Sequence, residues 1–381
     1  VVDGTGSGIA DARVHVSMKR HAFPFGTAIQ SMMVGGEPAD FPRYRYGRKT
    51  PRRTACTVQD ADNYRDVIER YFRQVTFESA LRPHVWQLAA RGDSADLQRQ
   101  QQVLIDRTVP WLQQRDISIR GHYIGWGAMG HPPMQRDFVG DAAGHRRWLW
   151  RHMRDILPAT EGFVTQWDTI NHIVGWGDTY EDQYGGPEIH AEIMREARRL
   201  APAIEHAINE GQILPGGGRR DAYERLIRFL NAEGQAPDVV GFMGHFTDSS
   251  LTSPTDLLAI YDRFAKVAPR LQLTELDVDA GDDELLQADY LRDVLIASFS
   301  HPHIEAIVMW GFWEQQHWKP DAALWRADWS LKPAGKAFVE LVTKQWWTDQ
   351  TLHTNGDGLS ELRGFFGTYE VTVEHAGAKV R

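Results

Sequence analysis

The stretch VTQWDTIN, residues 164–171, decides the fold of this 381-residue chain. Its β-branched and aromatic residues predict a short buried strand. An amphipathic helical pattern follows at 187–200, and the next strand-like run, AIEHAIN, comes at 203–209. Strands that alternate with helices pair in parallel, so this segment predicts a β-strand, helix and β-strand unit.

The same alternation runs through the middle of the chain. Eight such units over about 320 residues predict a closed (β/α)8 barrel. A doubly wound open sheet is the alternative, but it normally has a Gly-rich phosphate turn after an early strand, and no GxGxxG stands there. The other expected strands are FPFGTAIQ (23–30), QVTFES (74–79), SIRGHYIG (118–125), DVVGFMGHF (238–246), RLQLTELDV (270–278) and IEAIVMWGF (304–312). The other expected helices are 60–72, 96–115, 143–156, 220–233, 254–267, 284–299 and 333–345.

The two ends of the chain do not fit a barrel. Residues 1–18 and 352–381 alternate apolar and polar side chains around Gly turns, which is typical of β-hairpins. Neither end is long enough to bury a core alone. We therefore expect them to pair into one small antiparallel β-domain, 1–19 plus 350–381, with the barrel, 20–349, inserted between them. This domain resembles the carboxypeptidase-regulatory type of β-sandwich; two independent fraying ends are the alternative.

Composition excludes several classes of partner. The net charge is −9, which disfavours nucleic acid. No run approaches the roughly 18 apolar residues of a membrane span, so we expect no membrane partner either. The single cysteine, Cys56, rules out an intramolecular disulfide. No signal peptide is visible, but the sequence starts at Val1 without Met. The sequence therefore predicts no single location, and a secreted or periplasmic one stays among the alternatives.

Polar and aromatic side chains recur where the expected strands end. In a (β/α)8 barrel these C-terminal ends carry the chemistry. One such residue alone is more simply a satisfied core or capping residue, but so many at matching points indicate a site. They are Glu78, Arg82, His122, Trp126, Asn171, His172, Asn209, Glu210, His245, Glu275, Asp277, Trp310, Trp313 and Trp318.

Glu275 is the sharpest candidate among them. It lies in the apolar run LQLTELDVD, where a carboxylate must be hydrogen-bonded or ionised toward a cavity. His245 is a natural partner, because an imidazole can fix the orientation of the carboxylate. The Trp residues offer flat faces that suit the CH-rich face of a pyranose ring. Together these side chains indicate a carbohydrate or glycoside substrate.

The same segments resemble glycoside hydrolase family 10, the endo-β-1,4-xylanase family, over roughly residues 20–347. The resemblance implies a retaining hydrolase with two glutamates. The nucleophile, at the end of strand seven, maps onto Glu275, and the acid/base, at the end of strand four, belongs to a W-D-x-x-N-E pattern. The matching segments are FPFGTAI, QVTFES, RGHYIGW, QWDTIN, GFMGHF, LTELDVD, QADYLRDVLIASFSHP and WGFWEQQHW. The implied sugar-binding frame is Glu78, His122, Trp126, Asn171, His245, Glu275, Trp310 and Trp318.

The chain departs from this pattern at the acid/base position, which is His172. Histidine can give and take a proton near neutral pH, so His172 is a candidate for both roles. An imidazolium there would lower the pKa of Glu275, where a second carboxylate would raise it. The other departures are Met243 for a glutamine, Ser79 for an asparagine, Arg82 for a lysine and Gly127 for a His or Asn. We expect the sugar-binding frame to be largely kept while the proton-transfer groups are altered, and we also expect Arg82 and Met243 to contact the substrate.

Three readings of the site stay open. The first is a glycosidase whose acid is His172 or a substitute, for which Asp178, Glu181 and Glu314 are candidates. The second is a pseudo-enzyme that binds a β-linked glycan without cleaving it. The third is a repurposed barrel of non-glycosidic small-molecule chemistry, with His172 as acid or base.

Two further hypotheses concern ligands. His122, His172, His245 and Glu275 have acceptable ligand types for Zn²⁺, but the family's site is metal-free, so we expect no metal and no cofactor. The segment 34–59 is basic, and its side chains either contact an anionic substrate or form a solvated surface loop. They are Arg43, Arg45, Arg48, Lys49, Arg52 and Arg53. The sequence predicts no oligomeric state.

Overall fold

The computed structural model describes residues 1–37, 55–130 and 133–380. It divides into two compact units, Val1–Pro24 with Phe338–Arg381, and Phe25–Ala337. The domain limits expected from the sequence stay a proposal. The basic side chains expected to contact an anionic substrate lie outside the described residues: Arg43, Arg45, Arg48, Lys49, Arg52 and Arg53.

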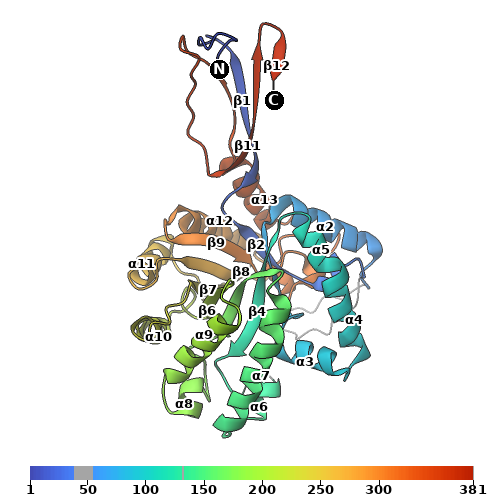
Figure 1. Ribbon diagram of the computed structural model, residues 1–381, viewed down its shortest axis with the longest axis vertical. Coiled ribbons are helices and arrows are strands. Elements are labelled where there is room, and N and C mark those ends of the chain that lie inside the picture. Colours follow the sequence, from blue (N-terminus) through green and yellow to red (C-terminus); the bar gives the residue numbers. More distant parts are fainter. Residues whose placement is uncertain (38–54, 131–132, 381) are drawn as a thin grey trace. The chain divides into compact units, whose positions relative to one another are not determined.

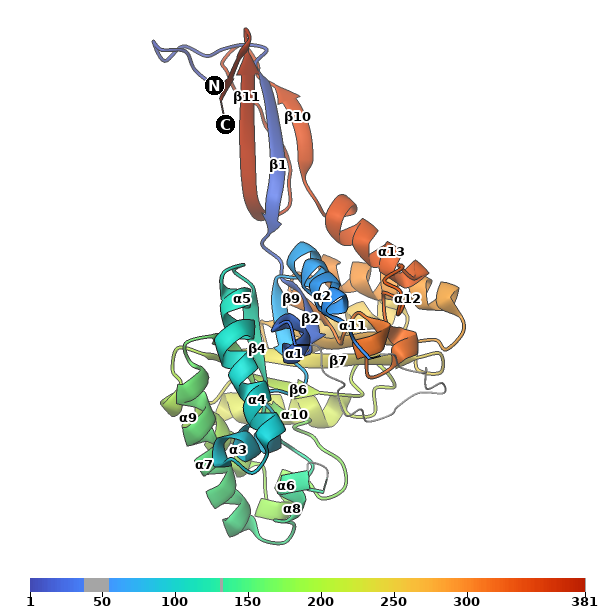
Figure 2. The same ribbon diagram turned by 90° about the vertical axis from the view of Figure 1, so that its right-hand side faces the viewer.

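Within the described residues, eight parallel strands close into a barrel in sequence order, and the last pairs with the first (Figure 1). Helices lie around the outside of these strands in both views (Figure 2). The predicted (β/α)8 barrel is therefore confirmed. Its strands are β2 Phe25–Ile29, β3 Gln74–Phe77, β4 Ser118–Trp126, β5 Val164–Asn171, β6 Glu205–Glu210, β7 Val239–Thr247, β8 Leu271–Asp279 and β9 Ile304–Met309.

Several helices begin where a polar side chain caps the first backbone N–H groups. The Thr57 hydroxyl accepts from the N–H of Asp60, and the Asp60 carboxylate accepts from the N–H of Thr57 in return. No helix in the described part of the chain is both long and apolar enough to cross a membrane. The α-helices are α1 Ser31–Val34, α2 Val58–Tyr71, α3 Pro83–Arg91, α4 Ala95–Val103, α5 Val109–Gln113, α6 Pro133–Arg136, α7 Ala142–Thr160, α8 Tyr180–Tyr184, α9 Glu188–Leu200, α10 Arg220–Ala232, α11 Pro254–Ala265, α12 Glu284–Ser300 and α13 Pro333–Glu340. Short π and 3-10 turns are η1 Leu104–Thr108, η2 Glu314–Gln316, η3 Pro320–Ala322 and η4 Leu341–Gln345.

The barrel interior holds a buried charge pair. Arg120 on β4 and Asp168 on β5 are both completely buried. The Arg120 guanidinium binds both oxygens of Asp168, and its Nε donates to Gln166 Oε1 at 2.8 Å. Losing one partner of a buried ion pair typically costs about 3–5 kcal/mol. This pair therefore ties β4 to β5 below the ends that carry the expected site.

Parallel register brings those strand ends to a common level. Direct partners across neighbouring strands are the residues that the sequence singled out. They are Trp126 with Asn171, Asn171 with Asn209, Met243 with Glu275, and His245 with Asp277.

Helices α7, α8 and α9 enclose three histidines, His145, His152 and His190, all completely buried. Their rings pack among aromatic neighbours such as Trp148, and His145 Nδ1 lies 2.7 Å from the Tyr184 hydroxyl. Burial lowers the pKa of His145 to about 4 and, first among the causes, the pKa of His152 and of His190 to about 3. All three rings are therefore neutral in the folded protein near pH 7.

The second unit is a four-stranded antiparallel sheet in the order β10-β1-β11-β12. Its strands are β1 Arg13–His21, β10 Asp349–His353, β11 Gly367–His375 and β12 Ala378–Val380. Val14, Val16 and Met18 of β1 are buried. The prediction that both chain ends form one antiparallel β-structure is confirmed. The resemblance to a β-sandwich stays a prediction, since these strands form a single sheet.

Candidate active site

Glu275 lies on β8 and is only 4% exposed. Its Oε1 accepts from Asn209 Nδ2 at 2.9 Å, and its Oε2 accepts from His245 Nε2 at 3.1 Å. Burial raises the pKa of Glu275, but the His245 hydrogen bond and the charges of His122, His245 and His172 outweigh it and bring the pKa to about 2. Glu275 is therefore ionised throughout the neutral pH range, and its two hydrogen bonds fix the position of the carboxylate.

His245, on β7, lies between two carboxylates. Its Nδ1 donates to Asp277 Oδ2 at 2.8 Å, and its Nε2 faces Glu275. An ionised carboxylate only accepts, so both ring nitrogens carry protons. Burial lowers the pKa of His245, but the charges and hydrogen bonds of Asp277 and Glu275 raise it to about 9. The imidazolium thus stays beside Glu275 at neutral pH.

Asp277 connects this pair to the loop after β9. Trp318 Nε1 donates to its Oδ2 at 2.7 Å, and Lys319 Nζ donates to its Oδ1 at 3.2 Å. Burial raises the pKa of Asp277, but the charges of His245 and Lys319 hold it well below its usual range. These bonds orient the Trp318 indole, whose ring centroid lies 4.8 Å from that of His245.

Two amides and a hydroxyl connect β5, β6 and β8. Asn209 Nδ2 donates to Asn171 Oδ1 at 3.1 Å as well as to Glu275. Thr274 Oγ1 donates to Asn209 Oδ1 at 2.6 Å. This hydroxyl fixes which end of the Asn209 amide faces Glu275, because only an amide oxygen can accept its proton.

His122, on β4, lies close to two carboxylates. Its Nδ1 is 2.8 Å from Asp168 Oδ2. Within the described residues, ligand atoms of His122, Asp168 and Glu275 lie within 4.8 Å of one another. The charge of Asp168 is already balanced by the guanidinium of Arg120, which would also repel a cation. These residues therefore form an ion-pair network more readily than a metal site. Of the other members of the zinc hypothesis, His172 faces Glu210, and His245 has both ring nitrogens engaged, one with Asp277 and one with Glu275.

His172 comes directly after β5. Its ring packs against Trp126, with centroids 4.4 Å apart, and meets Trp176 edge-on at 4.7 Å. Its Nδ1 lies 3.3 Å from Glu210 Oε1. His172 Cε1 and Met243 Sδ border the same space beside Gly211, at 3.4 and 3.5 Å from where a Cβ would stand. Met243 and His172 therefore both border Gly211.

Glu78 and Trp310 complete the surroundings of Glu275. Gln30 Nε2 donates to Glu78 Oε2 at 2.5 Å. Burial raises the pKa of Glu78, the charge of Arg82 offsets part of this, and the charge of Glu275 adds to the rise. Trp310 lies edge-on to His122 at 5.0 Å and to His245 at 6.2 Å. The structure thus gathers the residues that the sequence listed for the sugar-binding frame.

The carboxylates considered as substitute acids have other surroundings. Glu181, in α8, pairs with Arg225 at 2.9 Å. Glu314 accepts from the backbone N–H of Ala327 at 2.8 Å, and Asp178 is exposed. Glu210, which was noted only as a strand-end residue, is the carboxylate that His172 contacts.

Four residues that contact the candidate site residues could not be assigned to the site from the sequence. Thr274 directly precedes Glu275, and Trp176 stands in the Gly-rich stretch GWGD, so both carried a weak local signal. Lys319 and Arg219 carried none, because their partners Asp277 and Glu210 belong to other segments.

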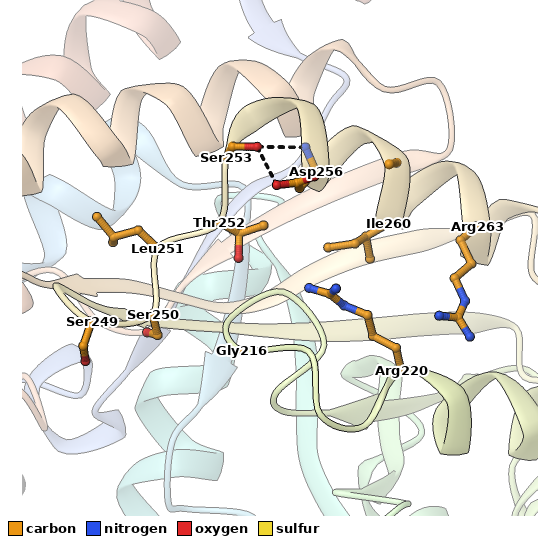
Figure 3. A pocket seen from close by; sticks show the side chains of 11 residues that line it. Gly216, Arg220, Ser249, Ser250, Leu251, Thr252, Ser253, Asp256, Ile260 and Arg263 are labelled. Atoms are coloured by element: carbon orange, nitrogen blue, oxygen red, sulfur yellow. Dashed lines mark hydrogen bonds between the residues drawn. The ribbon is translucent and has the colours of Figure 1, made fainter.

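A shallow pocket of about 420 Å³ lies between the loops after β6 and β7 (Figure 3). None of the expected site residues lines it. Arg220 at its edge donates to the Ile213 carbonyl, and Arg263 pairs with Asp221 and Glu224. Since these arginines are engaged, the strand-end network remains the candidate active site.

An ionised glutamate lies among amide side chains and indole rings at the C-terminal ends of the strands, which is where a (β/α)8 barrel carries its site. The model of glycosyl hydrolase family 10 matches residues 45–341, more than three quarters of the chain. The chain belongs to glycosyl hydrolase family 10, as its motifs predicted.

Similar proteins include one named an anti-sigma-I factor and several named endo-1,4-beta-xylanases. The Anti-sigma-I factor RsgI6 of Acetivibrio thermocellus is 28% identical over 378 residues, which are 99% of this chain and 44% of that protein. Endo-1,4-beta-xylanase 3 of Arabidopsis thaliana is 26% identical over 68% of this chain and 34% of its own length. This chain therefore spans less than half the length of these relatives. Xylanase 10B from Thermotoga petrophila RKU-1, solved with xylobiose, shares the fold with a TM-score of 0.66 at 19% identity, over 85% of this chain and 95% of that one.

Proposed function

We propose that this chain is a retaining β-glycosidase for xylan-type β-1,4-linked glycans, with Glu275 as nucleophile and His172 as acid/base. The observation that carries the proposal is the Glu275 carboxylate, buried, hydrogen-bonded by Asn209 and His245, and held at a pKa of about 2. A nucleophile must be an anion that is oriented toward the anomeric carbon. The substrate class follows from the relatives, several of which are named endo-1,4-beta-xylanases.

The first chemical step forms a bond between a Glu275 oxygen and the anomeric carbon. The bond to the leaving oxygen breaks, and His172 in its imidazolium form gives that oxygen a proton. In the second step the neutral ring takes a proton from water. The water oxygen attacks the anomeric carbon and releases Glu275, so the sugar keeps its configuration.

A histidine in this role affects the choice of leaving group. A phenolate with strong electron-withdrawing substituents leaves with little protonation, whereas a sugar hydroxyl needs the acid. General-acid help contributes about 10²–10⁴-fold. We therefore expect good turnover of dinitrophenyl xylobioside and a steep fall in rate as the leaving group becomes more basic.

Covalent trapping tests the nucleophile. With the dinitrophenyl glycoside of 2-deoxy-2-fluoro-xylobiose, the intact mass should rise by one fluorinated disaccharide, on the peptide that contains Glu275. Glu275→Ala should stay unlabelled and should turn over the unfluorinated glycoside only with added azide. The matched control is Glu305→Ala, which removes a carboxylate on β9 that pairs with Arg270. A label on another residue, or a Glu275→Ala variant as active as its parent, would refute the proposal.

A second candidate is a glycan-binding module that does not cleave. It is favoured by the missing glutamate at position 172 and by the alignment of 99% of this chain with a protein named an anti-sigma-I factor. Calorimetry with xylohexaose would show binding that Trp126→Ala weakens, together with no turnover of any aryl xylobioside. Absence of both binding and turnover would contradict both candidates.

A further inference from the structure

Glu210 is a buried carboxylate with several donors and no assigned role. It ends β6 directly after Asn209 and is completely buried. Its Oε2 accepts from the backbone N–H of Val174 at 2.7 Å, and its Oε1 accepts from its neighbour Gly211 N at 2.8 Å. These backbone bonds fix the carboxylate in one position. The positions of β6 and of the loop after β5 therefore determine which other side chains can contact the Glu210 carboxylate.

His172 reaches this carboxylate because its backbone is turned. Its φ is +50°, in the left-handed region, where histidine is one of the better-tolerated residues. The turn brings its carbonyl oxygen against Gly127, where a Cβ would come within 2.1 Å of that oxygen. Glycine at 127 and histidine at 172, two separate departures in the sequence, are thus coupled in space.

The contact with Glu210 selects one tautomer of His172. Arginine and backbone N–H groups surround Glu210, so it is an ionised acceptor, and the 3.3 Å contact requires the proton to be on His172 Nδ1. In the neutral ring the lone pair is then on Nε2. Trp126 and Trp176 hold the plane of the ring.

Arg219 competes for the same oxygen. Its Nη1 donates to Glu210 Oε1 at 2.7 Å, closer than His172, and its guanidinium lies 5.1 Å over the Trp176 ring. The charged groups that face His172 are Glu210 from β6, Arg219 from the start of α10 and Glu275 from β8. Arg219 therefore reduces the negative charge that His172 experiences from Glu210.

We propose that Glu210 is the positioning residue of His172. It accepts the hydrogen bond of the Nδ1 proton and so leaves Nε2 to exchange a proton with the substrate. Arg219 limits the attraction between Glu210 and the His172 ring. This proposal rests on the proposed function of His172 as acid/base. Glu210 itself does not touch the sugar in this scheme. Its effect should therefore appear in kcat rather than in KM.

Nitrogen-15 NMR of histidine-labelled protein tests the tautomer without any turnover. The His172 signals are assigned by their loss in His172→Gln. The neutral ring should show a protonated Nδ1 and an unprotonated Nε2, and Glu210→Gln should give a mixture of tautomers. The matched control, Glu205→Gln, changes a glutamate at the opposite end of the same strand and should leave the signals unchanged. A protonated Nε2 in the parent would overturn the proposal.

The pH profile of kcat on dinitrophenyl xylobioside gives a second, directional readout. Removing the carboxylate charge in Glu210→Gln disfavours the imidazolium, so the limb due to His172 should move to lower pH and kcat should fall about 100-fold. Removing the competing guanidinium in Arg219→Ala should move the limb to higher pH. Arg225→Ala, which removes an exposed arginine of α10 paired with Glu181, is the control and should not move it.

If the pH limb of kcat moved in the same direction in Glu210→Gln and in Arg219→Ala, Glu210 would have a merely structural role and the proposal would be overturned. Should Glu210→Gln fail to fold, Arg219→Ala alone still decides the direction. If no aryl glycoside is turned over at all, the proposed function fails, while NMR of the parent still decides the role of Glu210.

Discussion

Gly127→Ala should disturb the candidate acid/base without touching the sugar-binding side chains. The new Cβ would lie 2.1 Å from the His172 carbonyl oxygen and 3.2 Å from Ile173 Cα, whereas real Cβ contacts essentially never fall below 3.0 Å. The two segments must therefore separate by 3.0 − 2.1 = 0.9 Å at the carbonyl. Both are backbone, held by bonds from Gly127 N to Asn171 O and from Ile173 N to Asn209 O. No flexible side chain can absorb the change.

We expect two measurable effects of that separation. Forcing extra volume into a packed region costs about 1–3 kcal/mol, which urea denaturation would show as a lower midpoint with an unchanged slope. Displacement of about 1 Å at a catalytic group can cost about 100-fold in rate. The contact of His172 with Glu210 is already 3.3 Å, so the kcat for aryl xylobiosides should fall by that order while KM changes little.

Gly130→Ala is the matched control, since a Cβ there meets no described atom within 4 Å. It should keep the parent's stability and kcat. If Gly127→Ala also kept both, the coupling between Gly127 and His172 would be wrong. If the two variants lost activity equally, the effect would belong to the loop in general.

Three other predictions concern the histidines buried among α7, α8 and α9 and the hydrogen bonds around Glu275. The unfolded chain protonates its histidines below about pH 6.5, but burial keeps His145, His152 and His190 neutral in the folded protein down to about pH 4 or 3. Stability should therefore fall by about 2 kcal/mol per histidine between pH 7 and pH 5; equal melting temperatures at the two pH values would contradict this. His245→Gln removes the imidazolium charge that opposes the effect of burial, so the pKa of Glu275 should rise from about 2 and the acid limb of kcat/KM should move to higher pH; an unmoved limb would show that the charge of His245 does not lower the pKa of Glu275. Thr274→Val removes the hydroxyl that orients the Asn209 amide, and a lost hydrogen bond of about 1 kcal/mol corresponds to a roughly fivefold fall in kcat/KM; unchanged kinetics would mean that the amide is oriented by other contacts.

Much of the fold could be predicted because each strand carries its own signal. VTQWDTIN corresponds residue for residue to β5 Val164–Asn171, and the helices expected at 187–200 and 220–233 differ from α9 and α10 by one residue at one end each. The strand-end rule also found Glu275, His245 and Asn171, because parallel strands bring their C-terminal ends together.

The contacts of His172 could not be predicted in this way. The left-handed turn at His172 depends on the space left by Gly127, which is 45 positions earlier in the chain. Glu210 was visible at the end of a strand, but its choice of partners depends on the loop conformations after β5 and β6. Arg219 reaches Glu210 across such a loop, and no periodicity in the sequence encodes that contact.

The pairing of both chain ends in one sheet has a mechanical consequence. Arg13 at the start of β1 lies opposite Glu374 near the end of β11, and His21 lies opposite Gly367. Tension applied at residues 12 and 376 would therefore pull the two strands apart from the same end. The ladder would open one hydrogen-bonded pair after another, instead of resisting as a whole in shear. The pairing of β1 with β11 would therefore yield at a lower force than the same pairing loaded in shear.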